Sequence, residues 1–154
     1  MSINDVGGRE FRMTVQLHEE NVVRAIARCI GAVQRWQAAI LDYEVMEVSD
    51  GYDSDYVGIV LLIADGGTLT QDQFQLDRDA RQACVELCAA HKQGTIPSVA
   101  GFTLRLETTG SYRFDFKQEV KRLNGVWDAE AETYFDNYLT HYQREKSAAG
   151  GVSG

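Results

Sequence analysis

Hydrophobic and polar residues alternate most regularly between Gly101 and Lys117, where the sequence reads GFTLRLETTGSYRFDFK. The apolar side chains occupy every second position on either side of a polar centre; they are Phe102, Leu104, Leu106, Tyr112, Phe114 and Phe116. A period of two is typical of strands with one buried face. The segment is therefore predicted to be a β-hairpin whose apolar face needs further strands and helices to cover it.

The register of this hairpin follows from the side chains that each turn length would bring together. A two-residue loop would pair Leu104 with Asp115 and so mix apolar and charged residues on one face, whereas a three-residue loop pairs Leu104 with Phe114. We therefore predict a three-residue loop at residues 108–110. Gly110 stands at its last position, where the backbone must be left-handed and glycine has no Cβ penalty.

Two segments before the hairpin have the patterns of strands. Residues 39–48 alternate apolar and polar side chains, which predicts a strand with Asp42 and Glu44 on a solvated face, where ordinary pKa values are expected. Residues 56–64 read YVGIVLLIA and are apolar on both faces, as in an interior strand covered on both faces or at an edge of the core. Residues 49–55 between them read SDGYDSD, and this acidic segment is expected to form a turn.

Apolar residues recur at helical spacing in further segments. Residues 17–37 predict the first helix, in which Trp36 is expected to fill part of the core. Residues 74–92 predict the second helix. It is expected to follow a capping box, because Thr70 and Gln73 can satisfy each other's free backbone amides.

A third helix is predicted after Asp128, whose carboxylate can accept hydrogen bonds from free amides at a helix N-terminus. It carries an aromatic stripe of Tyr134, Phe135, Tyr138, Leu139 and Tyr142. The resulting order, αββαββα, predicts an α+β domain with a mostly antiparallel four-stranded sheet and packed helices. We expect residues 17–143 to form this single domain, residues 1–16 to be loosely ordered and residues 144–154 to be disordered.

Charge and cysteine content narrow the choice of partners and compartment. The chain has 154 residues and a formal net charge of −8, so its average surface repels nucleic acid and anionic membranes and attracts basic proteins. Neither nucleic acid nor a membrane is expected as a partner. The sequence shows no apolar run of the ~18 residues of a membrane span and no signal peptide, and its three cysteines include no Cys-x-x-Cys pair. The cytoplasm is the expected compartment.

One group of side chains resembles a metal site. Cys84, Cys88 and His91 share one face of the second predicted helix, and thiolates with imidazole are zinc ligands. Small cysteines that face a core give the same pattern, and the paired knuckles of structural zinc sites are missing. The acidic turn at residues 49–55 does not follow a calcium-loop consensus, since no glutamate closes the loop. No metal or cofactor is expected.

No combination of residues points to catalysis. The glycines that follow Asp65 lack both the P-loop lysine and the dinucleotide spacing. His18, His91 and His141 are scattered, and none stands beside a serine or cysteine in a nucleophile motif. We therefore expect a binding protein rather than an enzyme.

Three features occur together in the C-terminal half: a proline-led linker at residues 96–99, the strands FTLRLE and YRFDF around a Thr-Gly turn, and an aromatic region that Trp127 opens. In these features the chain resembles the YezG-like family of bacterial immunity proteins, which neutralise toxins made by the same cell. Upstream, Trp36 followed by a strand with YEV is similar to the family's first strand. The chain departs from the family at Ser98-Val99 and Phe116-Lys117, which bears on subfamily and toxin identity more than on fold.

The resemblance implies inhibition of a cognate toxin by tight one-to-one binding, without catalysis or a cofactor. Toxins opposed by this family are often nucleases or other nucleic-acid-acting enzymes, and an acidic inhibitor can be steered to their basic surfaces. We expect the contact surface to be the acidic turn, with the acidic face of the third helix as the second candidate. The residues are Asp50, Tyr52, Asp53, Asp55 and Tyr56 in the turn, and Glu130, Glu132 and Asp136 in the helix.

Three alternatives stay open. A secretion adaptor or chaperone that binds a neighbouring effector protein without silencing it fits the same composition. A small metal-dependent enzyme built on Cys84, Cys88 and His91 is a second possibility. Both acidic surfaces are also compatible with plain solvation. The sequence indicates neither the toxin nor the oligomeric state.

Overall fold

The computed structural model describes residues 3–31, 35–91, 99–117 and 119–152. The elements are, in order, α1 (Ile3–Gly31), β1 (Trp36–Val48), β2 (Gly51–Ile63), the short 3-10 helix η1 (Asp65–Gly67), β3 (Leu69–Gln73), α2 (Arg78–His91), β4 (Val99–Glu107), β5 (Tyr112–Lys117), α3 (Ala129–Asp136) and α4 (Tyr138–Val152). The strands form one antiparallel sheet in the order β3-β2-β1-β4-β5. The predicted α+β class is confirmed.

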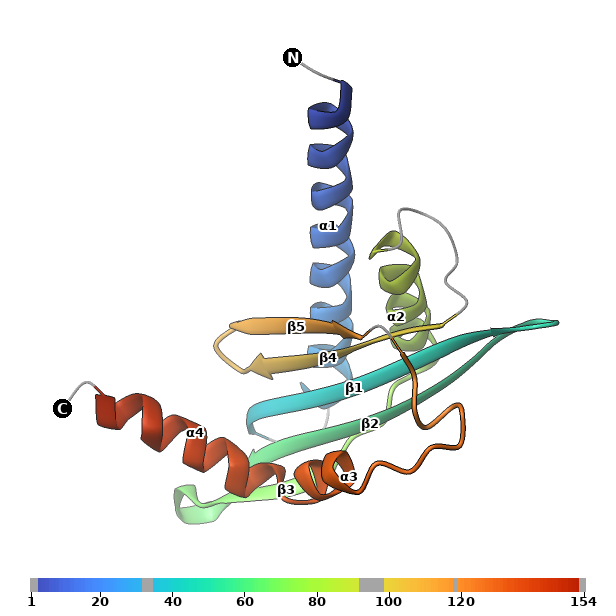
Figure 1. Cartoon of the computed structure of the whole chain (residues 1–154). Helices are drawn as coiled ribbons and strands as arrows, with labels where there is room; N and C mark the ends of the chain where they lie inside the picture. The colour runs from blue at the N-terminus through green and yellow to red at the C-terminus, as the bar shows by residue number, and fades with distance from the viewer. Residues whose placement is uncertain (1–2, 32–34, 92–98, 118, 153–154) are drawn as a thin grey trace.

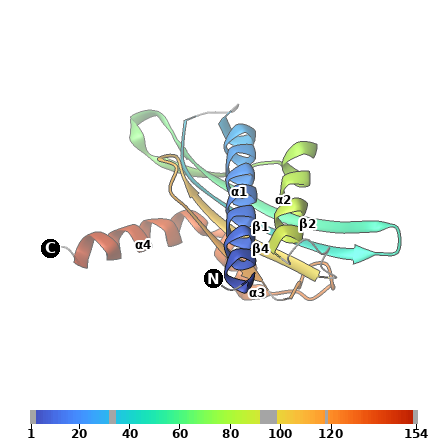
Figure 2. The same cartoon turned by 90° about the horizontal axis from the view of Figure 1, so that it is seen from above.

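Helices lie on both faces of this sheet. Helices α1 and α2 lie side by side over one face, and α3 and α4 lie on the other (Figures 1 and 2). Apolar residues of β2 contribute to both cores, so the prediction that this strand is covered on both faces is confirmed. In the part of the chain that the structure describes, every helix is too short or too polar to cross a bilayer.

The hairpin of β4 and β5 has the predicted register. Leu104 pairs with Phe114, and Leu106 pairs with Tyr112. The loop between the strands is residues 108–110, and Gly110 has a φ of +97°. This value lies in the left-handed region that the three-residue loop requires.

The sheet has five strands instead of four because β3 occupies the predicted capping box. Thr70 pairs with Leu62 of β2, so it does not cap a helix. Helix α2 begins later, and Asp77 caps it by accepting a hydrogen bond from the amide of Ala80 at 2.8 Å. Pairing satisfies backbone groups of β2 from Ile59 to Ile63, which a local cap cannot do.

Helix α1 differs from the prediction at both ends. It begins at Ile3, within the residues that were expected to be loosely ordered, and it ends at Gly31. Val22 and Ile26 are buried and hold its C-terminal half on the core, and extending a helix costs less than nucleating one. Trp36 consequently lies in β1, where it is half-buried against the core.

The predicted third helix is divided at Asn137, whose backbone leaves the helical region with φ −115° and ψ 31°. Gln71 of β3 holds this junction. Its side-chain amide donates to the carbonyls of Phe135 and Asp136, each at 3.0 Å, and its oxygen accepts from the amide of Leu139 at 2.8 Å. Helix α4 then runs to Val152, through residues that were expected to be disordered.

The remaining boundaries also differ from expectation. Only Ser49 and Asp50 form the turn between β1 and β2, so most of the predicted acidic turn is strand. Residues 96–98 of the proline-led linker, Lys92 at the end of the second predicted helix, and Gln118 lie outside the described part of the chain.

Candidate functional site

Asp42 and Glu44 are buried in the structure, with exposed fractions of 2% and 1%. The prediction of a solvated face for β1 is therefore wrong. This strand lies in the middle of the sheet, and the segment between β5 and α3 covers the face that carries both carboxylates. Burial of two carboxylates is costly unless cations and hydrogen-bond donors accompany them.

Asp42 has such partners on both oxygens. Its Oδ2 atom accepts hydrogen bonds from Lys117 Nζ at 2.7 Å and from Arg122 Nη1 at 2.6 Å, and its Oδ1 atom accepts from the Thr103 hydroxyl at 2.8 Å. Arg122 also donates from Nε to Asp55 Oδ2 at 2.5 Å. These contacts join β1, β2, β4, β5 and the segment before α3 in one network.

Glu44 is bonded mainly to the backbone of that segment. Its two oxygens accept from the amides of Lys121 at 3.2 Å and Leu123 at 3.3 Å, and from Lys117 Nζ at 3.3 Å. A carboxylate on a strand thus satisfies backbone amides of a connecting segment that has no strand or helix of its own. We call Asp42, Glu44, Lys117 and Arg122 the buried charge network.

The pKa of Asp42 is lowered in this network. Burial on its own would raise the pKa, but the positive charge of Lys117 and hydrogen bonds from Lys117, Arg122 and Thr103 outweigh it. The expectation of an ordinary pKa for Asp42 is therefore wrong. The pKa of Arg122 is raised, because its hydrogen bonds to Asp42 and Asp55 outweigh the cost of burial. Both groups are held in their charged forms.

A glycine makes room for the network. Gly101 of β4 stands between Glu44 on one side and Lys117 on the other in the strand pairing. A Cβ atom at Gly101 would lie 2.5 Å from the carbonyl oxygen of Tyr43 and 3.4 Å from Cδ of Lys117. The missing side chain lets Lys117 extend across β4 toward both carboxylates.

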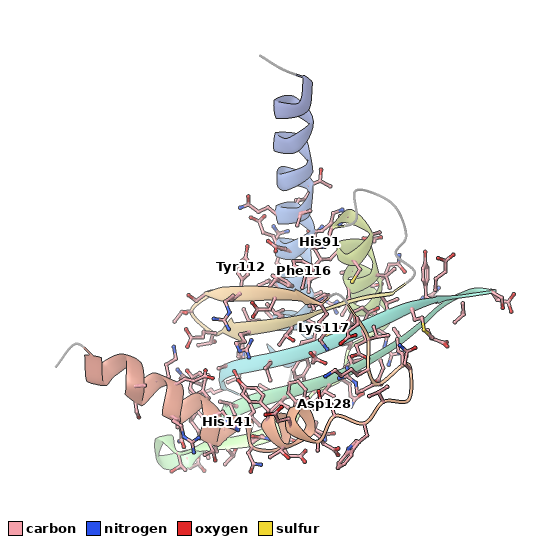
Figure 3. All side chains as sticks on the ribbon, viewed as in Figure 1. His91, Tyr112, Phe116, Lys117, Asp128 and His141 are labelled. Atoms are coloured by element: carbon pink, nitrogen blue, oxygen red, sulfur yellow. The ribbon has the colours of Figure 1, made fainter. Side chains whose placement is uncertain are left out.

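A cavity of about 780 Å³ opens above the network, between the sheet and α3. Two of the residues that line it are labelled in Figure 3: Lys117 at the end of β5 and Asp128 at the start of α3. The described residues that line it include no histidine, cysteine or serine. The cavity has paired charged groups at its base, and the exposed apolar side chains of Val126 and Trp127 lie at its edge. Such an arrangement suits binding.

The rim includes the most exposed large apolar side chain among the described residues. Trp127 is 76% exposed, and its neighbour Val126 is 52% exposed. Both line the cavity, together with Glu132 and Asp136 of α3. The indole Nε1 donates a hydrogen bond to Glu132. We call Val126, Trp127, Glu132 and Asp136 the Trp127 rim.

The start of α3 fixes the rim. Asp128 is the N-cap that the sequence predicted, and its side chain accepts from the amide of Ala131 at 3.1 Å. The same carboxylate pairs with Lys121 Nζ at 2.8 Å. The backbone amide of Lys121 in turn donates to Glu44. The rim is therefore connected to the buried charge network through the Asp128–Lys121 ion pair and the Lys121–Glu44 hydrogen bond.

The predicted acidic turn is divided between the two faces of the β1–β2 hairpin. Asp53 pairs with Met46 and Asp55 with Glu44, on the α3 face, whereas Tyr52 and Tyr56 pair with residues that face α1 and α2. Asp50 lies in the turn itself and is exposed. The five residues therefore do not form one surface patch.

Two of these residues already have partners within the chain. Asp55 is paired with Arg122, and the Tyr56 hydroxyl donates to Gln75 Oε1 at 2.8 Å and accepts from the amide of Leu76 at 3.0 Å. Asp50, Tyr52 and Asp53 are exposed. Their contact with a partner stays a prediction, as does that of the three acidic residues in α3.

The acidic residues of α3 are all exposed, and two of them border the cavity. Glu132 and Asp136 are one helical turn apart and belong to the Trp127 rim. Glu130 is exposed on a different side of α3, because residues two apart on a helix point in opposite directions.

The candidate zinc ligands are not arranged as a site. Cys84 and Cys88 belong to α2, and their side chains are buried in the core. Burial raises the pKa of the Cys84 thiol and raises that of the Cys88 thiol to about 12. His91 stacks on Phe116 with ring centroids 3.8 Å apart. Over the described ranges, no group of three or more His, Cys, Asp or Glu side chains is placed to hold a metal ion.

The sequence reasoning missed the network and the rim. The local pattern of β1 carried no signal for the network, because the central place of β1 in the sheet is set by pairing with strands distant in the sequence. Trp127 carried no signal, because a tryptophan beside a helix start is more often buried.

A scan against protein-family models finds no match to this sequence. A search among curated proteins finds no sequence with significant similarity to it. The geometry of the rim and the network is therefore the main basis for a functional proposal.

Proposed function

We propose that this chain is an immunity protein that neutralises a basic toxin made by the same cell, by binding it one-to-one through the Trp127 rim. The exposed indole of Trp127 carries the proposal. A tryptophan on the surface of a folded domain loses the hydrophobic gain of burial, and tryptophan is among the residues that contribute most to protein interfaces. A partner that covers Trp127 recovers that gain.

The buried charge network supports the proposal because it holds the rim in place before binding. The backbone amides of Lys121 and Leu123 donate hydrogen bonds to the carboxylate of Glu44, and these bonds order the segment that leads to Trp127. A surface that is already ordered pays less conformational entropy when a partner binds. Tight binding by a small rim then becomes feasible.

The charge of the rim supports a basic partner. Glu132 and Asp136 stand beside Trp127, and the whole chain carries a net charge of −8. A nuclease, or another toxin that acts on nucleic acid, presents cations where it binds phosphates. Carboxylates around a central aromatic residue can occupy such a site, and the toxin is then blocked without any chemistry by the inhibitor.

The test is survival of cells that express a toxin domain encoded beside this chain. Cells that co-express the wild-type chain are expected to survive, and purified proteins to form a one-to-one complex. Trp127→Ala should weaken binding by about 30-fold or more, the ~2 kcal/mol of an interface hot spot, and should reduce survival. Isothermal titration calorimetry measures the change.

Two control variants separate the rim from other surfaces. Glu86→Lys reverses an exposed charge on α2, on the opposite face of the sheet, and should leave binding unchanged. Tyr52→Ala removes an exposed aromatic residue from the β1–β2 hairpin and tests the other predicted surface. If Tyr52→Ala abolishes protection while Trp127→Ala does not, the rim is not the interface. Binding without protection would instead identify a secretion adaptor.

A further inference from the structure

We propose that two copies of this chain associate through β5, which pairs with its symmetry mate in antiparallel register centred on Phe114. The partner is a second copy of the same chain. The pairing extends the five-stranded sheet across a twofold axis, and it does not depend on the identity of any toxin.

The two edges of the sheet differ. At the β3 edge, the side chain of Gln71 bonds to the α3–α4 junction, so α3 and α4 lie against that strand. At the β5 edge, the described residues include no further strand or helix paired to the backbone. Strand β5 also lacks proline and has no bulge in its pairing with β4, so two of the usual protections of an open edge are missing; its charged side chains, Arg113, Asp115 and Lys117, alternate with the aromatic ones.

The hydrogen-bond pattern shows which residues face this edge. The backbone amide of Glu107 donates to the carbonyl of Ser111 at 2.9 Å, so these two residues form a hydrogen-bonded pair of the ladder. Bonding alternates along an antiparallel ladder, and residues 113, 115 and 117 therefore also bond toward β4. The amides and carbonyls of Tyr112, Phe114 and Phe116 point outward, where a second strand can pair with them.

Charge selects one register among those that the backbone permits. With Phe114 opposite Phe114 of the second copy, Arg113 stands opposite Asp115, and the contact occurs twice by symmetry. A shift by two residues in one direction places Arg113 opposite Arg113, and a shift in the other direction places Asp115 opposite Asp115. Opposite charges across strands are stabilising and like charges are not.

The apolar face of the same strand fits this register. Tyr112 is 38% exposed, and Phe114 and Phe116 are half-buried against the core that includes α1. Figure 3 shows Tyr112 and Phe116 on the side of the strand that faces α1. The rings of Phe114 and Phe116 stack with centroids 6.0 Å apart, and those of Tyr112 and Phe114 meet edge to face at 5.8 Å. In the dimer this row continues into the aromatic row of the second copy, since Tyr112 meets Phe116.

Helix α1 points to the same edge. It runs across the strands, and its N-terminal end extends beyond β5 (Figure 1). Its 29 residues span ~43 Å, whereas the five strands span only about 19 Å from β3 to β5. A second copy that pairs with β5 would therefore lie beside the N-terminal end of α1.

The experiment measures the oligomeric state of the full chain by sedimentation velocity over a range of concentrations. The wild-type chain is expected to dimerise. Arg113→Asp places two aspartates opposite each other and should raise the dimer dissociation constant at least about tenfold. The double variant Arg113→Asp, Asp115→Arg restores opposite charges and should restore the dimer.

In both variants the aspartate at position 113 stands opposite Arg105 of the same chain, so its charge is compensated within the chain. Equal unfolding midpoints confirm that the fold is retained. Amide hydrogen exchange gives a second readout: the amides of Tyr112, Phe114 and Phe116 should be protected in the dimer and exchange quickly after dilution. A chain that stays monomeric, a dimer that Arg113→Asp does not weaken, or unprotected amides at these three positions would overturn the proposal.

Discussion

At the scale of single residues, the burial of Asp42 has the largest energetic consequence. The carboxylate is surrounded by Lys117, Arg122 and the Thr103 hydroxyl, and its pKa is lowered. A carboxyl group whose pKa is lower in the folded than in the unfolded chain stabilises the fold above its unfolded pKa of about 4, and this contribution is lost as the pH falls below that value.

Replacement of Asp42 by Asn should therefore change the pH dependence of stability. At pH 7 the variant leaves two half-buried cations, Lys117 and Arg122, without one of their carboxylates, and we expect a loss of about 3 kcal/mol in the free energy of unfolding. Below about pH 4 the wild-type chain loses the same contribution, so the two curves should converge. Urea unfolding at several pH values measures this. Parallel curves, or an equal effect of Asp65→Asn at an exposed site outside the network, would contradict it.

The residue scale also shows where sequence reasoning succeeds and fails. The position of Gly110 was predictable because the steric demand of the loop and the pairing of Leu104 with Phe114 both act within one hairpin. The burial of Asp42 was not, because Arg122 lies 80 residues away in the chain and nothing in the local pattern of β1 refers to it. Burial of a polar residue is a tertiary property.

At the scale of elements, the central strands depend on close approach at Gly101. The side chains of Glu44 and Lys117 meet across this glycine, and a Cβ atom there would lie 2.5 Å from a backbone oxygen of β1. The oxygen belongs to a paired strand and cannot move freely. The spacing between β1 and β4 therefore depends on the missing side chain.

Replacement of Gly101 by Ala should destabilise the chain by about 1–3 kcal/mol, the usual cost of an overpacked core position. Thermal or chemical unfolding measures the loss. Gly31→Ala is the matched control, because a Cβ atom at Gly31 meets no other atom within 4 Å. An unchanged midpoint for Gly101→Ala would mean that β1 and β4 separate without cost.

Elements also differ in how well the sequence indicates them. The aromatic stripe of the third predicted helix was read correctly as a packing surface, since Tyr138 and Tyr142 are buried against Ile40 and Ile59. The break at Asn137 was missed, because its stabilising partner, Gln71, belongs to a strand that was itself read as a helix cap. One error in an edge strand thus concealed a feature in a distant helix.

At the scale of the whole molecule, net charge governs association more than stability. A chain with a charge of −8 attracts a basic partner over distances near the Debye length, about 8–10 Å at moderate ionic strength. In the proposed complex, this attraction acts on the rate of encounter, whereas contacts at Trp127 would act on the lifetime of the complex.

If the proposed immunity function holds, salt should slow association with the toxin and change dissociation little. Raising the ionic strength from about 0.05 M to about 0.5 M is expected to reduce the association rate constant about tenfold. Trp127→Ala should instead raise the dissociation rate constant. Stopped-flow fluorescence separates the two constants. A salt-independent association rate would remove electrostatic steering from the proposal.

The connection between the buried charge network and the Trp127 rim has a consequence for genetics. A screen for variants that lose protection would recover substitutions at Asp42 and Glu44 as readily as substitutions at the rim. Both carboxylates are almost fully buried at the base of the cavity, so substitutions there would act through the position of the segment that leads to Trp127. Positions that score as essential in such a screen would therefore map onto the interior of β1, and an interface drawn from them alone would be placed on the wrong side of the covering segment.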